Sequence, residues 1–226
     1  MKKILLIVAF IGVAGGLAFL SSCTKDDTTP PVITILGANP YNLVLNSSAY
    51  TDPGATAEDA KDGTVIVTEN ITSSNPDRNY SGAYTIIYTA VDAAGNEATA
   101  TRTVIVYNEA SVLEGSYSVI DAGKKLDYSD QVIASKTENR KITFQKFAAY
   151  TPCVVYANVG GSGNITLSTA MNVPSQLVLN AGSPAADRQF QGTGLFNTLN
   201  PFKFVISYSE FTNGNTVTGT GTYTKN

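Results

Sequence analysis

Acidic side chains gather in two short turns of the sequence. Glu58, Asp59 and Asp62 lie close together, and Asp92 is followed a few residues later by Asn96. Carboxylate and amide oxygens bind hard cations such as Ca²⁺, so two such turns that converge could hold calcium. Asp and Asn are also ordinary turn residues, and the pattern of an EF-hand loop is absent. We therefore interpret both turns as structural and assign no metal ligand, and the sequence leaves calcium binding open.

Tyrosine rings in loops are the candidates for ligand binding. The chain has 12 Tyr and 9 Phe but no Trp, and ligand sites present aromatic faces on which a sugar ring can stack. The Tyr residues in predicted loops are Tyr41, Tyr80, Tyr128 and Tyr150. A loop ring can also cap the core instead of binding a ligand. The Tyr residues in predicted strands, which we expect to pack against a sheet, are Tyr84, Tyr88, Tyr208 and Tyr223.

The sequence gives little support for a nucleophilic catalytic site. The chain has no His, which excludes Ser-His-Asp and Cys-His nucleophiles and imidazole metal sites. Cys153 follows Pro152 at a predicted strand start, and we interpret it as a small buried side chain. The glycine-rich segment 160–163 lacks the Lys of a phosphate-binding loop and is predicted to be a hairpin turn. A glycosidase needs two carboxylates across a cleft, and one sequence cannot show that pair. We predict neither an enzyme nor a cofactor.

Alternating apolar and polar residues predict the elements that position these side chains. From Pro31 onward the chain consists of short alternating runs interrupted by Gly, Pro, Asn and Asp, which is typical of β-strands. The clearest pair is 83–91 and 98–107, joined by a five-residue turn at 92–96. We predict an all-β chain with one unit at 31–108 and a second at 112–226.

The first unit carries a family resemblance. The matching segments, in order, are Pro31–Ile33, Asn39-Pro40, Tyr50–Ala57, Asp62-Gly63, Gly82–Ile86, Tyr88–Asn96 and Thr101–Val104. Over residues 30–108 the sequence resembles the bacterial surface immunoglobulin-like domain that also occurs in pesticidal crystal proteins. This resemblance implies a seven-stranded β-sandwich without catalysis that serves as a spacer or adhesion module.

The second unit is predicted to be an antiparallel barrel or sandwich of about eight strands. The expected strands are 115–121, 141–147, 153–159, 164–167, 175–179, 190–195, 202–211 and 216–223. We expect the first and last strands to pair and close the structure. Segments 113–117 and 219–225 are similar to C-terminal modules of uncharacterised Bacteroidota lipoproteins. The basic residues Lys136, Arg140, Lys141 and Lys146 could meet an acidic glycan, but we favour a solvated strand face.

The N-terminus predicts a lipid anchor. Two Lys precede an apolar run at 4–20, and Leu20-Ser21-Ser22-Cys23 resembles the lipobox of bacterial lipoproteins, which implies diacylation of Cys23. We predict a lipoprotein signal peptide at 1–22 and a tether at 23–30. Lys25-Asp26-Asp27 is similar to the surface-export signal of Bacteroidota lipoproteins. That similarity implies an outer-membrane protein that faces the cell exterior.

The function expected from these features is binding rather than catalysis. The formal net charge of −3 argues against a nucleic-acid partner. We predict a non-enzymatic cell-surface lipoprotein that binds a glycan or a host or matrix protein, with the immunoglobulin-like unit as spacer. The alternative is a structural or adhesive accessory subunit of an outer-membrane complex without a small-molecule ligand.

Overall fold

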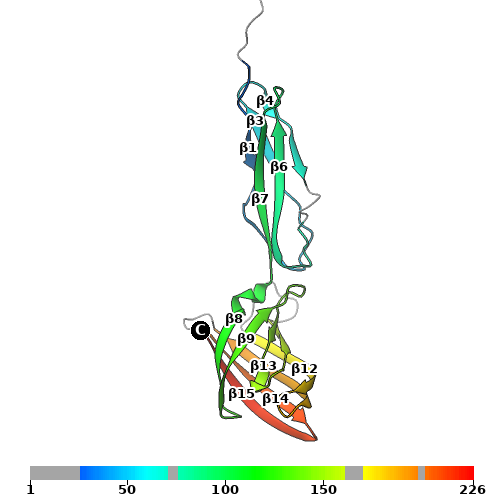
Figure 1. The fold of residues 1–226 in the computed structure, drawn as a ribbon, viewed down its shortest axis with the longest axis vertical. Helices are drawn as coiled ribbons and strands as arrows, with labels where there is room; N and C mark the ends of the chain where they lie inside the picture. The colour runs from blue at the N-terminus through cyan, green and yellow to red at the C-terminus, as the bar shows by residue number, and fades with distance from the viewer. Residues whose placement is uncertain (1–25, 71–75, 161–169, 198–201) are drawn as a thin grey trace, which may run out of the picture.

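The computed structural model describes residues 26–70, 76–160, 170–197 and 202–226. The described chain is built of β-strands with two short 3₁₀-helices, in two units placed end to end (Figure 1). This confirms the predicted all-β class. Among the described residues, none of the helices has the length and apolar character needed to cross a membrane.

The first unit is a seven-stranded sandwich. Its strands are β1 (Val32–Ile35), β2 (Tyr41–Val44), β3 (Ala55–Asp59), β4 (Gly63–Val65), β5 (Val67–Asn70), β6 (Gly82–Val91) and β7 (Glu97–Tyr107). One sheet has the order β1-β3-β4 and the other β2-β7-β6-β5, with β2 parallel to β7. Ile86, Tyr88 and Ala90 point into the core, as the alternation of β6 predicts.

A buried ion pair explains two of the sequence motifs in this sandwich. Arg102 on β7 is fully buried and lies 3.3 Å from the carboxylate of Asp52. Its guanidinium donates to the Tyr88 hydroxyl and to three main-chain carbonyls, including that of Gly54. Tyr88 and Tyr50 in turn donate to Asp52 at 2.7 Å each. A buried guanidinium needs this many partners, so the Asp52-Pro53-Gly54 turn and Arg102 form one structural unit.

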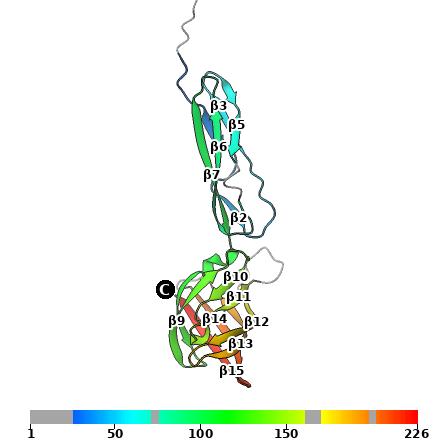
Figure 2. The ribbon, with the colours of Figure 1, turned by 45° about the vertical axis from the view of Figure 1, so that its right-hand side comes forward.

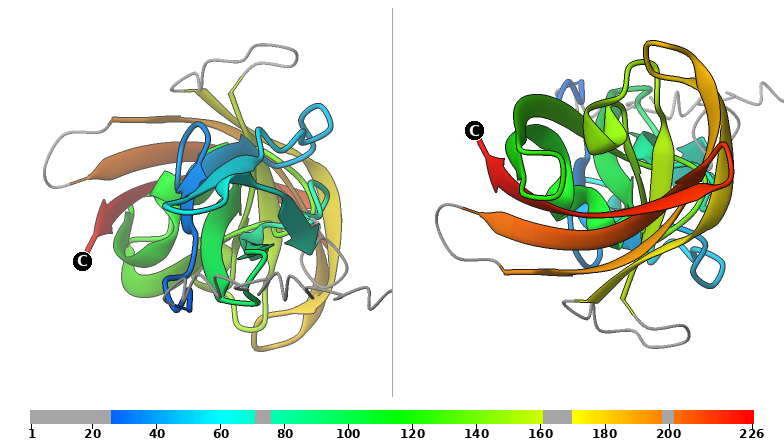
Figure 3. Two further views of the ribbon diagram at one scale, coloured as in Figure 1. Left: turned by 90° about the horizontal axis from the view of Figure 1, so that it is seen from above. Right: turned by 90° about the horizontal axis from the view of Figure 1, so that it is seen from below.

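The second unit is a closed up-and-down barrel, which settles the choice between barrel and sandwich. Its strands are β8 (Gly115–Asp121), β9 (Leu126–Ala134), β10 (Lys141–Phe144), β11 (Val155–Val159), β12 (Ala170–Ala181), β13 (Ala186–Phe196), β14 (Lys203–Thr212) and β15 (Asn215–Lys225). Each strand is antiparallel to its sequence neighbours, and β15 pairs with β8 as expected. Figure 3 views this unit along the long axis of the molecule, and Figure 2 brings β10 and β11 forward.

The strands predicted around β9 and β10 differ from the structure, whereas the expected strand at 164–167 lies outside the described residues and stays a prediction. The strand β9 was not predicted, because Asp127, Ser129 and Asp130 interrupt its apolar pattern. The predicted strand at 141–147 ends earlier, since the chain turns at residue 144 into the 3₁₀-helix η2 (Phe147–Ala149).

Aromatic rings fill the interior of the barrel. Phe204 lies between Tyr117 and Tyr223, with ring centres 4.9 and 4.5 Å away. Phe147 of η2 enters the barrel and contacts Phe190 and Tyr208 at 5.4 and 5.2 Å. This barrel therefore has a packed core where other barrels of eight strands hold a ligand.

The junction between the units centres on Asn108, the N-cap of the 3₁₀-helix η1 (Glu109–Leu113). Its side-chain amide donates to the carbonyls of Ser135, Glu138 and Lys141. Its side-chain oxygen accepts from the main-chain N–H groups of residues 110 and 140. One buried side chain thus fastens the end of the sandwich to the barrel loop between β9 and β10.

Candidate functional site

A groove lies on the outer face of the barrel across β12 to β15, and it is lined by polar side chains together with apolar groups that include Val173 and Pro174. Its volume is about 810 Å³, within the range of roughly 300–1,000 Å³ that is typical of ligand sites. The side chains with hydroxyl or amide groups that line it are Asn172, Ser175, Gln191, Thr193, Ser207, Ser209, Thr218 and Thr220. Ala122 and Gly123, in the turn between β8 and β9, form the rim at the end of the barrel remote from the sandwich.

The strand register builds the floor of this groove. Thr193 pairs with Ser207, and Ser207 pairs with Thr220, so three outward hydroxyl groups form a row across three strands. Gln191, Ser209 and Thr218 form the next outward row in the same register. The intervening residues, such as Tyr208, point inward and are buried. Two parallel rows of short polar side chains therefore replace the bulkier residues found elsewhere on the barrel surface.

Glycines on the inner face curve the sheet behind the groove. Gly192 and Gly219 flank Tyr208 in the register. A Cβ at Gly219 would lie 2.3 Å from Cζ of Tyr208, and one at Gly192 would lie 2.5 Å from the carbonyl oxygen of Ser207. Only glycine permits strands and ring to approach this closely, and such positions mark sharp bends in a sheet. The Tyr208 hydroxyl donates to Asp121 at 2.6 Å and fixes the ring under the groove.

The groove suits a neutral, hydroxyl-rich ligand. Its hydroxyl and amide groups both donate and accept hydrogen bonds, and the described residues that line it include neither a carboxylate nor a cation. Threonine methyl groups add small apolar contacts. Because neighbouring strands lie about 4.7–4.9 Å apart in the hydrogen-bonding direction, the polar groups within each row repeat at that spacing across the strands.

The four candidate tyrosines do not converge. Tyr41 lies in β2 rather than in a loop and packs edge-on against Tyr50. Tyr80 is exposed in the turn before β6, where its carbonyl accepts from Tyr84. Tyr128 lies in β9, also not in a loop, and packs against the barrel core with its hydroxyl 3.3 Å from that of Tyr223. None of these residues lines the groove.

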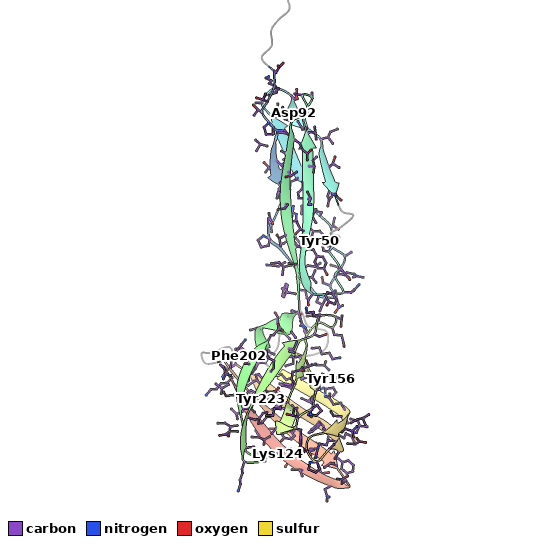
Figure 4. All side chains as sticks on the ribbon, in the orientation of Figure 1. Tyr50, Asp92, Lys124, Tyr156, Phe202 and Tyr223 are labelled. Atoms are coloured by element: carbon purple, nitrogen blue, oxygen red, sulfur yellow. The ribbon has the colours of Figure 1, made fainter. Side chains whose placement is uncertain are left out.

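Tyr150 belongs to a buried charge cluster at the end of the barrel. Its hydroxyl donates to Glu210 at 2.8 Å, and its ring centre lies 3.5 Å from Nζ of Lys124 and 3.9 Å from Cζ of Arg188. Both cations also pair with Glu210. Burial would raise the pKa of Glu210, but hydrogen bonds from Lys124 and Tyr150 hold this pKa below its ordinary value. Lys124 marks the position of this cluster in Figure 4, and the ring of Tyr150 is already engaged by two cations.

Cys153 is buried in the barrel core, which confirms the prediction for this residue. Burial raises the pKa of its thiol to about 12, so the reactive thiolate is scarce at neutral pH.

The basic residues near β10 do not form the solvated strand face that the sequence predicted. Arg140 binds Glu109 at 2.7 Å and Lys141 binds Glu138 at 2.6 Å, and these two basic side chains are only 15% and 21% exposed. Lys136 and Lys146 lie 5.9 Å from the ring centres of Tyr80 and Tyr128.

Some predicted features fall outside the described residues. Cys23, the predicted lipid acceptor, lies there, and so do residues 161–163 of the glycine-rich segment. Both remain predictions.

The acidic turns do converge. Asp59 ends β3 and Asp92 follows β6, and both lie at the sandwich end remote from the barrel (Figure 4). The carboxylate of Asp62 links the turns by accepting from the main-chain N–H of Ala93 at 2.8 Å. Glu58 is not part of the group, because its side chain is exposed and accepts from Thr64.

Comparison with known proteins agrees with the sandwich. Residues 33–106 match the family model described as bacterial surface protein, Ig-like domain. This confirms the resemblance deduced from the sequence motifs. No protein of curated function matches the sequence.

Two solved structures show distant likeness. The lipoprotein BT2262 from Bacteroides thetaiotaomicron is 17% identical with a TM-score of 0.31, over 87% of this chain and 100% of that one. The second contains CBM51-2 in complex with GlcNAc and INT domains from Clostridium perfringens ZmpB. It is 16% identical with a TM-score of 0.28, over 77% of this chain but 29% of that one. At these TM-scores the likenesses establish neither a shared fold nor a shared function.

Proposed function

We propose that this chain is a non-enzymatic lipoprotein, anchored in the outer membrane through Cys23, that binds a neutral glycan in the groove of its barrel. The observation that carries the proposal is the groove itself, with two register rows of hydroxyl and amide side chains on an otherwise packed barrel. Sugars present hydroxyl groups that match such donors and acceptors.

The arrangement of the two units supports a display role. The N-terminal segment joins the sandwich near Asp92, at the opposite end of the molecule from Lys124 and the rim of the groove (Figure 4). A chain anchored at Cys23 would therefore carry the groove on the side away from the membrane. Residues 33–106 match a domain of bacterial surface proteins, which fits the spacer role.

Glycan binding is tested with the full-length chain on a glycan array, followed by calorimetry with the best ligand. We expect the double substitution Asn172→Ala and Gln191→Ala to weaken binding at least about tenfold, because each lost hydrogen bond contributes about 0.5–1.5 kcal/mol. The matched control is Gln131→Ala, an exposed amide on β9 outside the groove. Equal affinities of the double variant and the control, or an array without ligands, would refute the groove as a glycan site.

An accessory role in a larger complex is the second candidate. Large apolar side chains on the outer face of the barrel favour it, since Leu177 and Leu179 are each 62% exposed and Leu195 is 65% exposed. A protein that copurifies with the wild-type chain, and is lost when Leu177 and Leu179 are changed to Ser, would support this role over glycan binding.

A further inference from the structure

One carboxylate at the tip of the sandwich lacks a partner for one of its oxygens. Asp59 is only 7% exposed. Its Oδ1 accepts from the main-chain N–H groups of Lys61 and Asp62 at 2.7 and 3.0 Å. Its Oδ2 is buried and has no hydrogen-bond partner among the described residues. Buried polar atoms nearly always have a partner, so this oxygen points to a group that the protein chain does not itself provide.

A second carboxylate is held beside the first. Asp92 is also 7% exposed, and Asn96 donates to both its oxygens, through the main chain and the side chain, at 2.7 Å each. These bonds fix the orientation of the carboxylate.

The third carboxylate comes from the segment that precedes the sandwich. The side chain of Asp27 is 10% exposed, and its main-chain carbonyl accepts from the side chain of Asn96 at 3.2 Å. One oxygen from each of Asp27, Asp59 and Asp92 can be chosen so that all three lie within 4.8 Å of one another. Ligands on opposite sides of a calcium ion are about 4.6–5.2 Å apart, because Ca–O distances are about 2.3–2.6 Å. The cluster thus has the size of a calcium shell.

The local charge is unbalanced. Lys61 lies 3.7 Å from Asp27, but its side chain is half exposed, and one ammonium contributes a single charge against three carboxylates. Three carboxylates in this space repel one another strongly unless a cation of higher charge joins them.

We propose that Asp27, Asp59 and Asp92 bind a calcium ion at the tip of the sandwich. The ion gives Asp59 Oδ2 its missing partner, and water completes the shell. Because Asp27 belongs to the preceding segment, whereas Asp59 ends β3 and Asp92 follows β6, the ion fastens residues 26–29 to the sandwich. The direction in which the molecule leaves its anchor then depends on calcium. With three carboxylates in the shell, we expect a Kd on the order of 0.1–1 mM, the range of extracellular modules.

The test is calorimetric titration of the metal-free full-length chain with CaCl₂, together with thermal unfolding in EGTA and in 10 mM CaCl₂. We expect one site per chain and a rise in the Tm of the sandwich of several degrees with calcium, since a bound ion stabilises the folded state. Equal concentrations of MgCl₂ control for ionic strength. No heat up to 10 mM CaCl₂, or the same Tm rise with MgCl₂, would overturn the proposal.

Two variants locate the site. Asp27→Ala should weaken calcium binding about tenfold or more, and it lies outside the strands of the sandwich, so folding should survive. Asp59→Asn keeps the Oδ1 acceptor for the turn while it removes the ligand charge, and it should abolish the Tm rise. The matched control is Asp26→Ala, an exposed neighbour outside the cluster. If Asp26→Ala weakens binding as much as Asp27→Ala, the effect is general screening and the assigned site is wrong.

Discussion

Asp130 offers a direct test of the barrel interior. It lies on β9 and is 4% exposed. Its Oδ1 accepts from the main-chain N–H groups of residues 131, 145 and 146 at 2.7–3.0 Å, which ties β9 to the turn that leads into η2. Its Oδ2 is buried without a hydrogen-bond partner among the described residues. Burial raises the pKa of this carboxyl to about 6, despite the hydrogen bonds that oppose the rise.

The raised pKa of Asp130 determines how the stability of the barrel depends on pH. The folded state binds the proton more tightly than the unfolded chain, whose Asp pKa is about 3.9, so this group makes stability fall as pH rises from about 4 to 6. With a folded pKa of about 6, the ionised carboxylate costs about 3 kcal/mol at pH 8 and about 1 kcal/mol at pH 4.5. Asp130→Asn keeps the Oδ1 acceptor and imitates the protonated acid. It should therefore stabilise the barrel about 2 kcal/mol more at pH 8 than at pH 4.5.

Urea unfolding of wild type and variant at both pH values measures this difference. Comparing the two proteins at each pH cancels the contributions of all other titrating groups. Asp127→Asn, an exposed position on the same strand, is the control and should show no such difference. A stability gain from Asp130→Asn that is equal at the two pH values would show that the carboxyl titrates normally and that the argument from burial is wrong.

Three further substitutions test the packing. Gly219→Ala places a methyl group 2.3 Å from Cζ of Tyr208 and should lower the free energy of unfolding by about 1–3 kcal/mol. Gly82→Ala is the control and should not lower it, because no atom lies closer than 3.7 Å to the added methyl group. Arg102→Met leaves the Asp52 carboxylate without its ionic partner and should cost about 3–5 kcal/mol in urea unfolding, while the exposed Arg78→Met should cost little. Asn108→Ala removes the side chain that caps η1 and donates to three carbonyls, and it should lower the free energy of unfolding by about 2–4 kcal/mol. An unchanged Tm would contradict the central role of Asn108 in the junction.

The sandwich was predictable because its motifs have local physical causes. Gly54 has a φ of +80°, a conformation that glycine adopts readily, and its carbonyl accepts from Arg102. The segment 92–96 forms the turn between β6 and β7 that its sequence predicts. Arg102 is the residue whose role was missed. A single arginine among threonine and valine residues is typical of a strand position that faces solvent. Its burial becomes evident only from the carbonyl and carboxylate groups that distant turns place around it.

The groove was not predictable from the sequence. Ser207, Thr193 and Thr220 are ordinary outward residues on their own strands, and nothing in any single strand distinguishes them. They become a site only when the register aligns them across β13, β14 and β15. Gly192 and Gly219 allow the sheet to bend closely, but which face is hollow depends on the inward position of Tyr208.

The two proposed sites place different demands on the fold. A metal cluster needs a few carboxylates brought from separate chain segments, and the turns at one end of a sandwich provide them because consecutive strands return to that end. A groove for an extended neutral ligand needs many weak donors at regular spacing, and a continuous sheet provides them through its register. If calcium fixes the preceding segment to the tip, the hydrogen bonds of Asn108 at the junction link that fixed segment and sandwich to the barrel. Loss of the ion should change how the groove is presented without altering the groove itself, so glycan affinity in solution should be the same in calcium and in EGTA.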